Sequence, residues 1–472
     1  MSLKNIERNP LAKRIFERRY FLLGFFILFV CNAVLSTRMD LKIGYDNHYY
    51  WWLFSEKITA DWKVNFSELE TWRGYVFPAY CVILNKSAGG GYKYFILLNS
   101  MMNAFMFMYI IPKFQRTYFS QKASSLFSVL NFAIMFIFFS GLFLYTLSDS
   151  YALYMCLFSV FFLMRSEEEK SSVGLFLNCF CCGVFSYFAY NIRTIYMFSG
   201  IATFILFCIF VLGKQNSWLR RLACTIFLFL GLLFASLPQA FLNYKHNGVK
   251  SVFVPTQSLM LAQCSWGITY QRYDTFTGFF IHEEHEQEIP QMKFEDPVGK
   301  KLLEEEHIKV FPTWKAFAKF CLKYPFEVAG IYVRHLANAL FPCWPNVYVM
   351  KINNNKVLYA LLSIALVFFS FGLAVIFRCV RNLKFFVYFI PALVSCLFIL
   401  PGAVEARFFL ALFLMFSSTM CFNVDYKKLL AMVNAHKISV AFVFMVFSGL
   451  MISQWALFLM SESEIPIFML GR

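Results

Sequence analysis

Long apolar runs separated by short basic loops dominate this chain of 472 residues. A helix needs about 20 predominantly apolar residues to cross the hydrocarbon core of a bilayer. The chain is 59% hydrophobic and 15% charged, whereas soluble domains are typically about 25% charged. We therefore predict an all-α polytopic membrane protein with about 11 transmembrane helices. The predicted spans are residues 20–36, 92–112, 124–146, 150–164, 172–190, 194–213, 222–241, 357–377, 385–401, 407–422 and 438–459.

Lys and Arg residues predict the orientation of these spans, because the cytoplasmic loops of membrane proteins are enriched in them. With the amino terminus inside, every short loop that the spans place in the cytoplasm is basic. These loops carry Lys113, Arg116 and Lys122; Arg165 and Lys170; Lys214, Arg220 and Arg221; Arg378, Arg381 and Lys384; and Lys427, Lys428 and Lys437. We therefore assign the net charge of +16 to membrane topology. Membrane lipid, and no nucleic acid, is the expected partner of that charge.

The amino-terminal segment is predicted to be a retained membrane anchor. Its basic residues, from Lys4 to Arg19, lead into an apolar run that lacks a small-residue cleavage site. Two long loops, residues 37–91 and 242–356, are then predicted to face the exterior. Residues 74–86 form a weaker apolar run that is too short to span, and we interpret them as an interfacial helix.

Polar residues interrupt three apolar stretches of about 40 residues near their middles, so each stretch is predicted to be a hairpin with a charged tip. Residues 124–164, 172–213 and 385–422 have the tips Ser148-Asp149-Ser150, Asn191-Ile192-Arg193 and Glu405-Ala406-Arg407. The predicted topology places all three tips on the exterior, the face of the first long loop. Charges are costly near lipid and are kept there mainly where they line a cavity or serve a function. We interpret the three tips as parts of one shared site.

The first exterior loop places an acidic residue before a run of aromatic residues. Asp46 is followed by Tyr49, Tyr50, Trp51 and Trp52, and the loop continues to Glu70, Trp72 and Arg73. A carboxylate and a guanidinium at a membrane surface suit a lipid with a charged head group. We predict that Asp46 is the chemical centre and Arg73 its anion-binding partner. Asp40 is the alternative acid, although its position just beyond the first span is explained by a simple polar boundary.

The second exterior loop has no pattern typical of a metal or nucleotide site. His282, His285 and His307 lie near acidic clusters, but their irregular spacing favours a solvated surface. The sequence has no Walker loop, dinucleotide fingerprint or zinc spacing, so an activated donor is expected to arrive within the membrane. Within the amphipathic stretch of residues 316–340, Pro325 and Phe326 begin a predicted helix that carries Arg334 and lies along the membrane surface.

Taken in order, these features resemble the GT-C class of integral-membrane glycosyltransferases, in the branch with the protein mannosyltransferases and the aminoarabinose transferase acting on lipid A. The resemblance covers residues 20–422. It rests on Asp46 followed by aromatics, Arg73-Gly74-Tyr75-Val76-Phe77-Pro78, Leu147 through Leu153, Asn191-Ile192-Arg193-Thr194, Pro238 through Asn243-Tyr244 to Gly248, and Glu405-Ala406-Arg407-Phe408-Phe409-Leu410. It implies a catalytic transmembrane domain over residues 1–422, followed by a cytoplasmic loop and a last transmembrane helix in residues 423–472.

The same resemblance implies an inverting glycosyltransferase. The donor would be a sugar on a polyprenyl phosphate. The acceptor would be a hydroxyl of a lipid-linked glycan or glycolipid, such as O-antigen or lipopolysaccharide, on the periplasmic face of a bacterial inner membrane. Asp46 matches the catalytic acid of the family's first loop, but Asn47 stands where many members have a second acid. No tightly bound metal is therefore predicted, and a divalent cation stays open as a cofactor.

The predicted mechanism needs a base for the acceptor proton and cations for the leaving phosphate. A carboxylate in a partly dry cavity has a raised pKa, which suits Asp46 to general base catalysis. Guanidinium groups match phosphate geometry, so Arg73, Arg193 and Arg407 are assigned to the donor phosphate. Acceptor or sugar binding and orientation are assigned to Asp149, Glu70, Glu405, Tyr49, Trp72 and Arg334. The alternative role of Asp149 is to orient Arg193 through an ion pair. The alternative functions are a polyprenyl-linked glycan polymerase, a flippase, an acyltransferase and a non-enzymatic scaffold.

Overall fold

The structure is a computed structural model in which residues 10–37, 74–87, 92–118, 125–145, 147–275, 291–340, 342, 356–376 and 383–422 are described, together with positions 431, 434, 435, 445 and 449. Five predicted site residues, Asp46, Tyr49, Glu70, Trp72 and Arg73, lie outside the described residues, as does Asp40. The predicted domain 423–472 and its span 438–459 lie outside them apart from those single positions.

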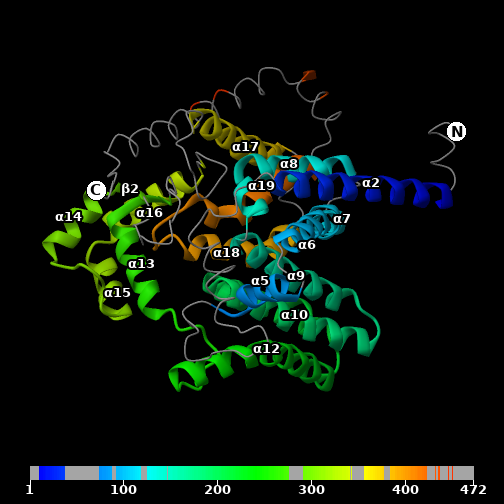
Figure 1. Ribbon diagram of the computed structural model, residues 1–472, viewed down its shortest axis with the longest axis horizontal. Helices are drawn as coiled ribbons and strands as arrows, with labels where there is room; N and C mark the ends of the chain where they lie inside the picture. The colour runs from blue at the N-terminus through cyan, green and yellow to red at the C-terminus, as the bar shows by residue number, and fades with distance from the viewer. Residues whose placement is uncertain are drawn as a thin grey trace.

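Helices make up most of the described chain (Figure 1). The first half contains α2 Pro10–Thr37, α5 Val76–Ser87, α6 Tyr92–Phe105, the π-helix η2 Met106–Ile110, α7 Ile111–Tyr118, α8 Ser125–Leu144, α9 Ser148–Glu168, α10 Ser172–Ile192, the short 3-10 helix η3 Thr194–Tyr196, α11 Met197–Phe210, the 3-10 helix η4 Leu212–Lys214 and α12 Trp218–Asn247. The second half contains α13 Gln257–Thr269, β1 Tyr270–Thr275, β2 Gln291–Glu295, α14 Pro297–Glu305, α15 Trp314–Lys323, α16 Pro325–Ala339, α17 Lys356–Ile376, α18 Leu383–Phe398, the 3-10 helix η6 Ala406–Phe409 and α19 Leu410–Phe422.

Five helical segments of the described chain are long and apolar enough to cross a membrane. They are Lys93–Phe114, Ser125–Leu144, Ser172–Ile192, Thr194–Lys214 and Trp218–Asn247. Spanning segments must satisfy their own backbone hydrogen bonds, which a helix does. The prediction of an integral membrane protein built from helices is therefore confirmed, while the total number of spans stays a prediction.

One face of α12 is made of exposed apolar side chains. Ile226, Phe229, Leu233 and Phe241 follow one another at helical spacing and are 47–52% exposed. Residues three and four apart share a helix face, and a continuous apolar face of this kind needs a nonpolar covering. Lipid tails would supply that covering in a membrane.

The opposite face of α12 packs directly on α10 through two glycines. A Cβ atom at Gly183 would lie 2.1 Å from the carbonyl oxygen of Leu228, and one at Gly231 would lie 2.1 Å from the carbonyl oxygen of Phe180. Small residues allow transmembrane helices to approach at backbone contact. The carboxyl-terminal ends of α10 and α12 are consequently held together.

Helices α13 to α16 and strands β1 and β2 form a separate packed unit, here called the α13–α16 subdomain. It has its own hydrophobic core, made of Leu261, Ile268, Leu302, Leu303, Phe311, Phe320, Val328 and Ile331. Strands β1 and β2 pair antiparallel, and this hairpin is a local departure from the helical fold of the described residues. The Tyr270-Gln-Arg-Tyr-Asp-Thr segment places aromatic and β-branched residues in β1, and such residues favour strands.

Two helices can be compared directly with the sequence prediction. Helix α16 begins at Pro325, as predicted, and the separate helix α15 precedes it in the amphipathic stretch, because Pro325 cannot continue a helix. Helix α5, which is predicted to be interfacial, buries Phe77 and Cys81 in the main core, and its place at the membrane surface stays a prediction. A Cβ at Gly74 would lie 1.8 Å from the carbonyl oxygen of Asn191, so the chain entering α5 is packed against the end of α10.

Candidate active site

Four charged side chains from the three predicted hairpin tips form one buried ion cluster. Arg193 Nη1 lies 2.7 Å from Asp149 Oδ1, and Arg407 Nη1 lies 3.9 Å from Asp149 Oδ2. Arg407 also makes a bidentate pair with Glu405, with Nε to Oε2 and Nη2 to Oε1 both at 2.9 Å. Asp149, Glu405 and Arg407 are all at most 9% exposed. We call these four residues the ion cluster.

Each member of the cluster lies where a helix begins or ends. Asp149 is in the first turn of α9, where the helix dipole favours a negative charge. Arg193 is the C-cap of α10 and has an extended backbone with φ −143° and ψ 116°. Glu405 is extended just before η6, which contains Arg407. The breaks in the helices thus turn these side chains towards one another.

The two guanidinium groups share one aromatic ring. Arg193 Cζ is 4.9 Å and Arg407 Cζ is 5.2 Å from the centre of the Phe408 ring. Cations are attracted to the faces of aromatic rings. Phe408 therefore holds both guanidinium groups close to Asp149, even though their like charges repel.

The second carboxylate oxygen of Asp149 keeps an unused hydrogen-bonding capacity. Oδ2 is buried and has no hydrogen-bond partner among the described residues, and Arg407 is beyond bonding distance at 3.9 Å. A buried carboxylate oxygen in this condition is exceptional, because buried polar atoms are nearly always bonded. Oδ2 is thus a buried acceptor that no described residue satisfies.

A chain of buried amide side chains begins at Asn191, two positions before Arg193 of the ion cluster. The backbone N–H of Val76 donates to Asn191 Oδ1 at 2.9 Å, and Asn191 Nδ2 donates to Gln239 Oε1 at 2.9 Å. Gln239 Nε2 donates in turn to Asn243 Oδ1 at 3.0 Å. Asn243 Nδ2 finally donates to the carbonyl groups of Ser251 and Phe253, at 2.7 and 2.8 Å. We call Asn191, Gln239 and Asn243 the amide chain.

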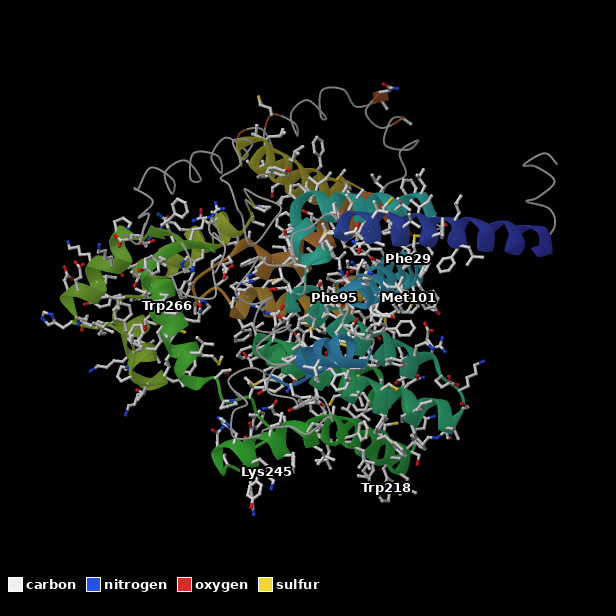
Figure 2. The ribbon with its side chains drawn as sticks, viewed as in Figure 1. Phe29, Phe95, Met101, Trp218, Lys245 and Trp266 are labelled. Atoms are coloured by element: carbon white, nitrogen blue, oxygen red, sulfur yellow. The ribbon has the colours of Figure 1, made fainter. Side chains whose placement is uncertain are left out.

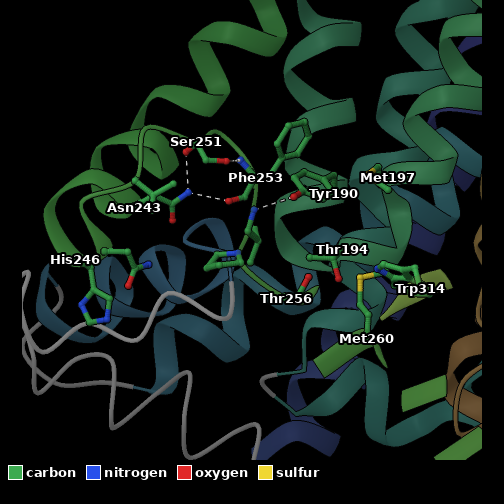
Figure 3. A pocket seen from close by; sticks show the side chains of 14 residues that line it. Tyr190, Thr194, Met197, Asn243, His246, Ser251, Phe253, Thr256, Met260 and Trp314 are labelled. Carbon is green, nitrogen blue, oxygen red and sulfur yellow. Dashed lines mark hydrogen bonds between the residues drawn. The ribbon is translucent and has the colours of Figure 1, made fainter. Parts of the chain in front are cut away.

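A cavity of about 910 Å³ opens next to the amide chain (Figure 3). Its lining comes from α10 to α12, from the segment that follows α12, and from the α13–α16 subdomain, and consists of Tyr190, Thr194, Met197, Asn243, His246, Asn247, Val249, Ser251, Phe253, Val254, Pro255, Thr256, Met260 and Trp314. Thr194 follows Arg193 directly, so the cavity borders the backbone of the ion cluster. Figure 2 shows Lys245 and Trp218 at opposite ends of α12, and the cavity lies at the Lys245 end.

Arg334 lies outside the ion cluster. Its guanidinium makes a bidentate pair with Asp296, at 2.6 and 2.9 Å, and Asp296 is fully buried. The neighbouring His335 was not identified from the sequence. Its two ring nitrogens lie 2.6 Å from the Leu400 carbonyl oxygen and 3.1 Å from that of Tyr270. His335 thus joins the α13–α16 subdomain to the chain segment that leads to Glu405.

No group of three or more His, Cys, Asp or Glu side chains suited to a metal ion is found among the described residues. In the ion cluster, Asp149 and Glu405 already face arginines. Sequence reasoning also missed Gln239, Trp314 and the cavity, since a single glutamine in an apolar run and a single tryptophan in a loop form no pattern. Searches of protein-family models, curated proteins and solved structures find no match to this chain.

Proposed function

We propose that this protein is an inverting glycosyltransferase that moves a sugar from a polyprenyl phosphate to a hydroxyl of a cell-envelope glycan or glycolipid. The observation that carries the proposal is the buried ion cluster, with two arginines and a carboxylate oxygen free to accept a hydrogen bond, beside a cavity of about 910 Å³. An anionic leaving group needs fixed cations, and the attacking hydroxyl group needs an acceptor for its proton.

In this mechanism the acceptor oxygen attacks the anomeric carbon as the bond from that carbon to the phosphate oxygen breaks. The hydroxyl proton passes to a carboxylate, for which Asp46 of the first loop is the proposed base. Arg193 and Arg407 donate charge-assisted hydrogen bonds to the departing phosphate. Asp149 holds Arg193 in place at 2.7 Å and orients the acceptor through Oδ2.

The charge balance of the cluster assigns a role to Arg73. Two carboxylates, Asp149 and Glu405, face two guanidinium groups, so the cluster is neutral before a donor binds. An incoming phosphate then needs further positive charge. Arg73 is the proposed source. It directly precedes Gly74, whose backbone packs against Asn191 near the end of α10.

The remaining parts of the proposal concern location. The amino terminus would lie in the cytoplasm of a bacterium, about 11 helices would cross the inner membrane, and the ion cluster would face the periplasm. The carrier lipid would reach the cluster from the membrane, past the apolar face of α12 that contains Phe229 and Leu233.

The test is sugar transfer by the purified protein in lipid, with a panel of polyprenyl-phosphate sugars and a lipopolysaccharide acceptor. We expect turnover by the wild type, a loss of about 100-fold or more in Asp46→Asn, and normal turnover in Asp40→Asn. Arg407→Lys in the ion cluster should also lose activity, and Arg220→Lys, at the start of α12, is its matched control. Full activity of Asp46→Asn would show that another residue is the base. Transport or polymerisation of the donor without transfer would support the alternative functions.

A further inference from the structure

The cavity beside the ion cluster has a lining that is nearly free of charge. Among its 14 described lining residues there is no Asp, Glu, Lys or Arg, and His246 is its one side chain able to become positive. A phosphate or carboxylate buried there would lack a strong cation, and burying an unpaired charge is costly. The chemistry of the lining therefore favours an uncharged ligand, and its size is in the usual range for ligand sites, about 300–1,000 Å³.

Two hydroxyl groups on the cavity wall are available to such a ligand. Thr194 and Thr256 line the cavity, and the structure gives their hydroxyl groups no hydrogen bond to another described residue. A hydroxyl group donates one hydrogen bond and accepts others. Two such groups match the hydroxyl groups of a sugar, which also donate and accept.

Aromatic rings supply the complementary apolar surface. Tyr190 and Trp314 line the cavity from α10 and from the α13–α16 subdomain. The Tyr190 hydroxyl accepts a hydrogen bond from the N–H of Val254 at 2.8 Å, which fixes the ring in place. Trp314 is 42% exposed. Pyranose rings present faces of C–H groups that pack on such rings, while their edges carry hydroxyl groups.

The amide chain holds the outer wall of the cavity in one conformation. Both Nδ2 hydrogens of Asn243 are used, by the carbonyl groups of Ser251 and Phe253, and its Oδ1 is used by Gln239. Gly248 ends α12 with φ +67°, a left-handed conformation that turns the chain towards this wall. A wall that is fixed before binding lowers the entropic cost of holding a ligand.

We infer that this cavity binds an uncharged sugar unit of the acceptor glycan. That the sugar belongs to the acceptor rests on the proposed function, whereas its lack of charge rests on the cavity lining alone. Thr194 and Thr256 bond the sugar hydroxyls and Trp314 packs on the ring face. Because Thr194 follows Arg193, the bound unit lies next to the ion cluster, which retains the charged part of the donor. The charged phosphate of the donor thus lies at the ion cluster, and the uncharged sugar of the acceptor lies in the cavity beside it.

Saturation-transfer NMR on the full chain in lipid nanodiscs tests this inference without turnover. The probes are methyl hexopyranosides of several configurations, the corresponding hexuronates and inorganic phosphate. We expect saturation of at least one neutral glycoside, and a decrease of about fivefold or more in Thr194→Val and in Trp314→Ala. Trp218→Ala, at the other end of α12, is the matched control and should bind as the wild type does.

Thr194→Val keeps the shape of the side chain, so this variant tests the hydroxyl even if Trp314→Ala perturbs folding. Stronger saturation of hexuronate or phosphate than of every neutral glycoside would overturn the inference, as would unchanged binding in both cavity variants. The proposed function is tested separately. Neutral sugar binding without any transfer would contradict the glycosyltransferase, while transfer without neutral sugar binding would contradict the role of this cavity.

Discussion

Replacing Gln239 with methionine should weaken the packing of α10 against α12. Methionine is similar in length and lacks the amide group. In the native fold Gln239 accepts a hydrogen bond from Asn191 at 2.9 Å and donates one to Asn243 at 3.0 Å. The substitution leaves one donor and one acceptor buried without partners.

The expected loss of stability follows from these two groups. A buried donor or acceptor without a partner lowers the free energy of unfolding by about 1–3 kcal/mol. A hydrogen bond between membrane helices contributes about 0.6 kcal/mol to stability on average. Two bonds therefore set limits of about 1 and 6 kcal/mol. Gln239 and Asn191 are fully buried, and we expect a loss of about 2–4 kcal/mol.

Unfolding in mixed detergent and dodecyl sulfate micelles, followed by circular dichroism, measures this loss. Gln215→Met, in the loop before α12, is the control for the same chemical change and should be close to the wild type. Asn243→Leu and the double variant complete a cycle, in which coupled residues give effects that do not add. A Gln239→Met variant within about 0.5 kcal/mol of the wild type, or an additive double variant, would refute the amide chain as a stabilising unit.

Three further predictions concern packing and the α13–α16 subdomain. Gly183→Val should separate α10 from α12 and lower the unfolding midpoint, because a Cβ would lie 2.1 Å from the carbonyl oxygen of Leu228; an unchanged midpoint would contradict the close packing. Arg334→Met should cost about 3 kcal/mol by leaving the buried carboxylate of Asp296 unpaired, and an additional Asp296→Asn substitution should restore part of it. Burial lowers the pKa of His335, which its two carbonyl partners only partly offset. The unfolded state then takes up the proton first, so stability should fall as pH decreases from about 6.5, and His335→Gln should flatten that dependence in pH-resolved unfolding curves.

Hydropathy and charge were enough to predict the helices and the meeting of the hairpin tips. Charges are costly near lipid, so Asp149, Arg193 and Arg407 had a physical reason to pair, and the structure places them in one cluster. The partners themselves were not predictable in detail. Phe408, which holds both guanidinium groups, looks like any other phenylalanine of an apolar run.

Contacts between distant residues explain what the sequence did not reveal. Gln239 bonds a residue 48 positions away, and no local pattern encodes that pairing. The short apolar run of α5 likewise does not reveal that tertiary packing buries Phe77 in the main core. Strands β1 and β2 pair although residues 276–290 separate them in the sequence. Neither strand has a long alternation of apolar and polar residues, which is the pattern that predicts a strand.

The rate of sugar transfer by Arg407→Lys most directly tests whether the ion cluster binds the leaving phosphate. It is measured in single-turnover experiments with a polyprenyl-phosphate sugar. Lysine keeps the charge but cannot make the bidentate pair with Glu405 or donate in the same fork geometry. We expect the rate to fall about 100-fold or more in a variant that keeps its helical spectrum and unfolding midpoint. Transfer at the wild-type rate in Arg407→Lys would contradict the assignment of the ion cluster to the leaving phosphate.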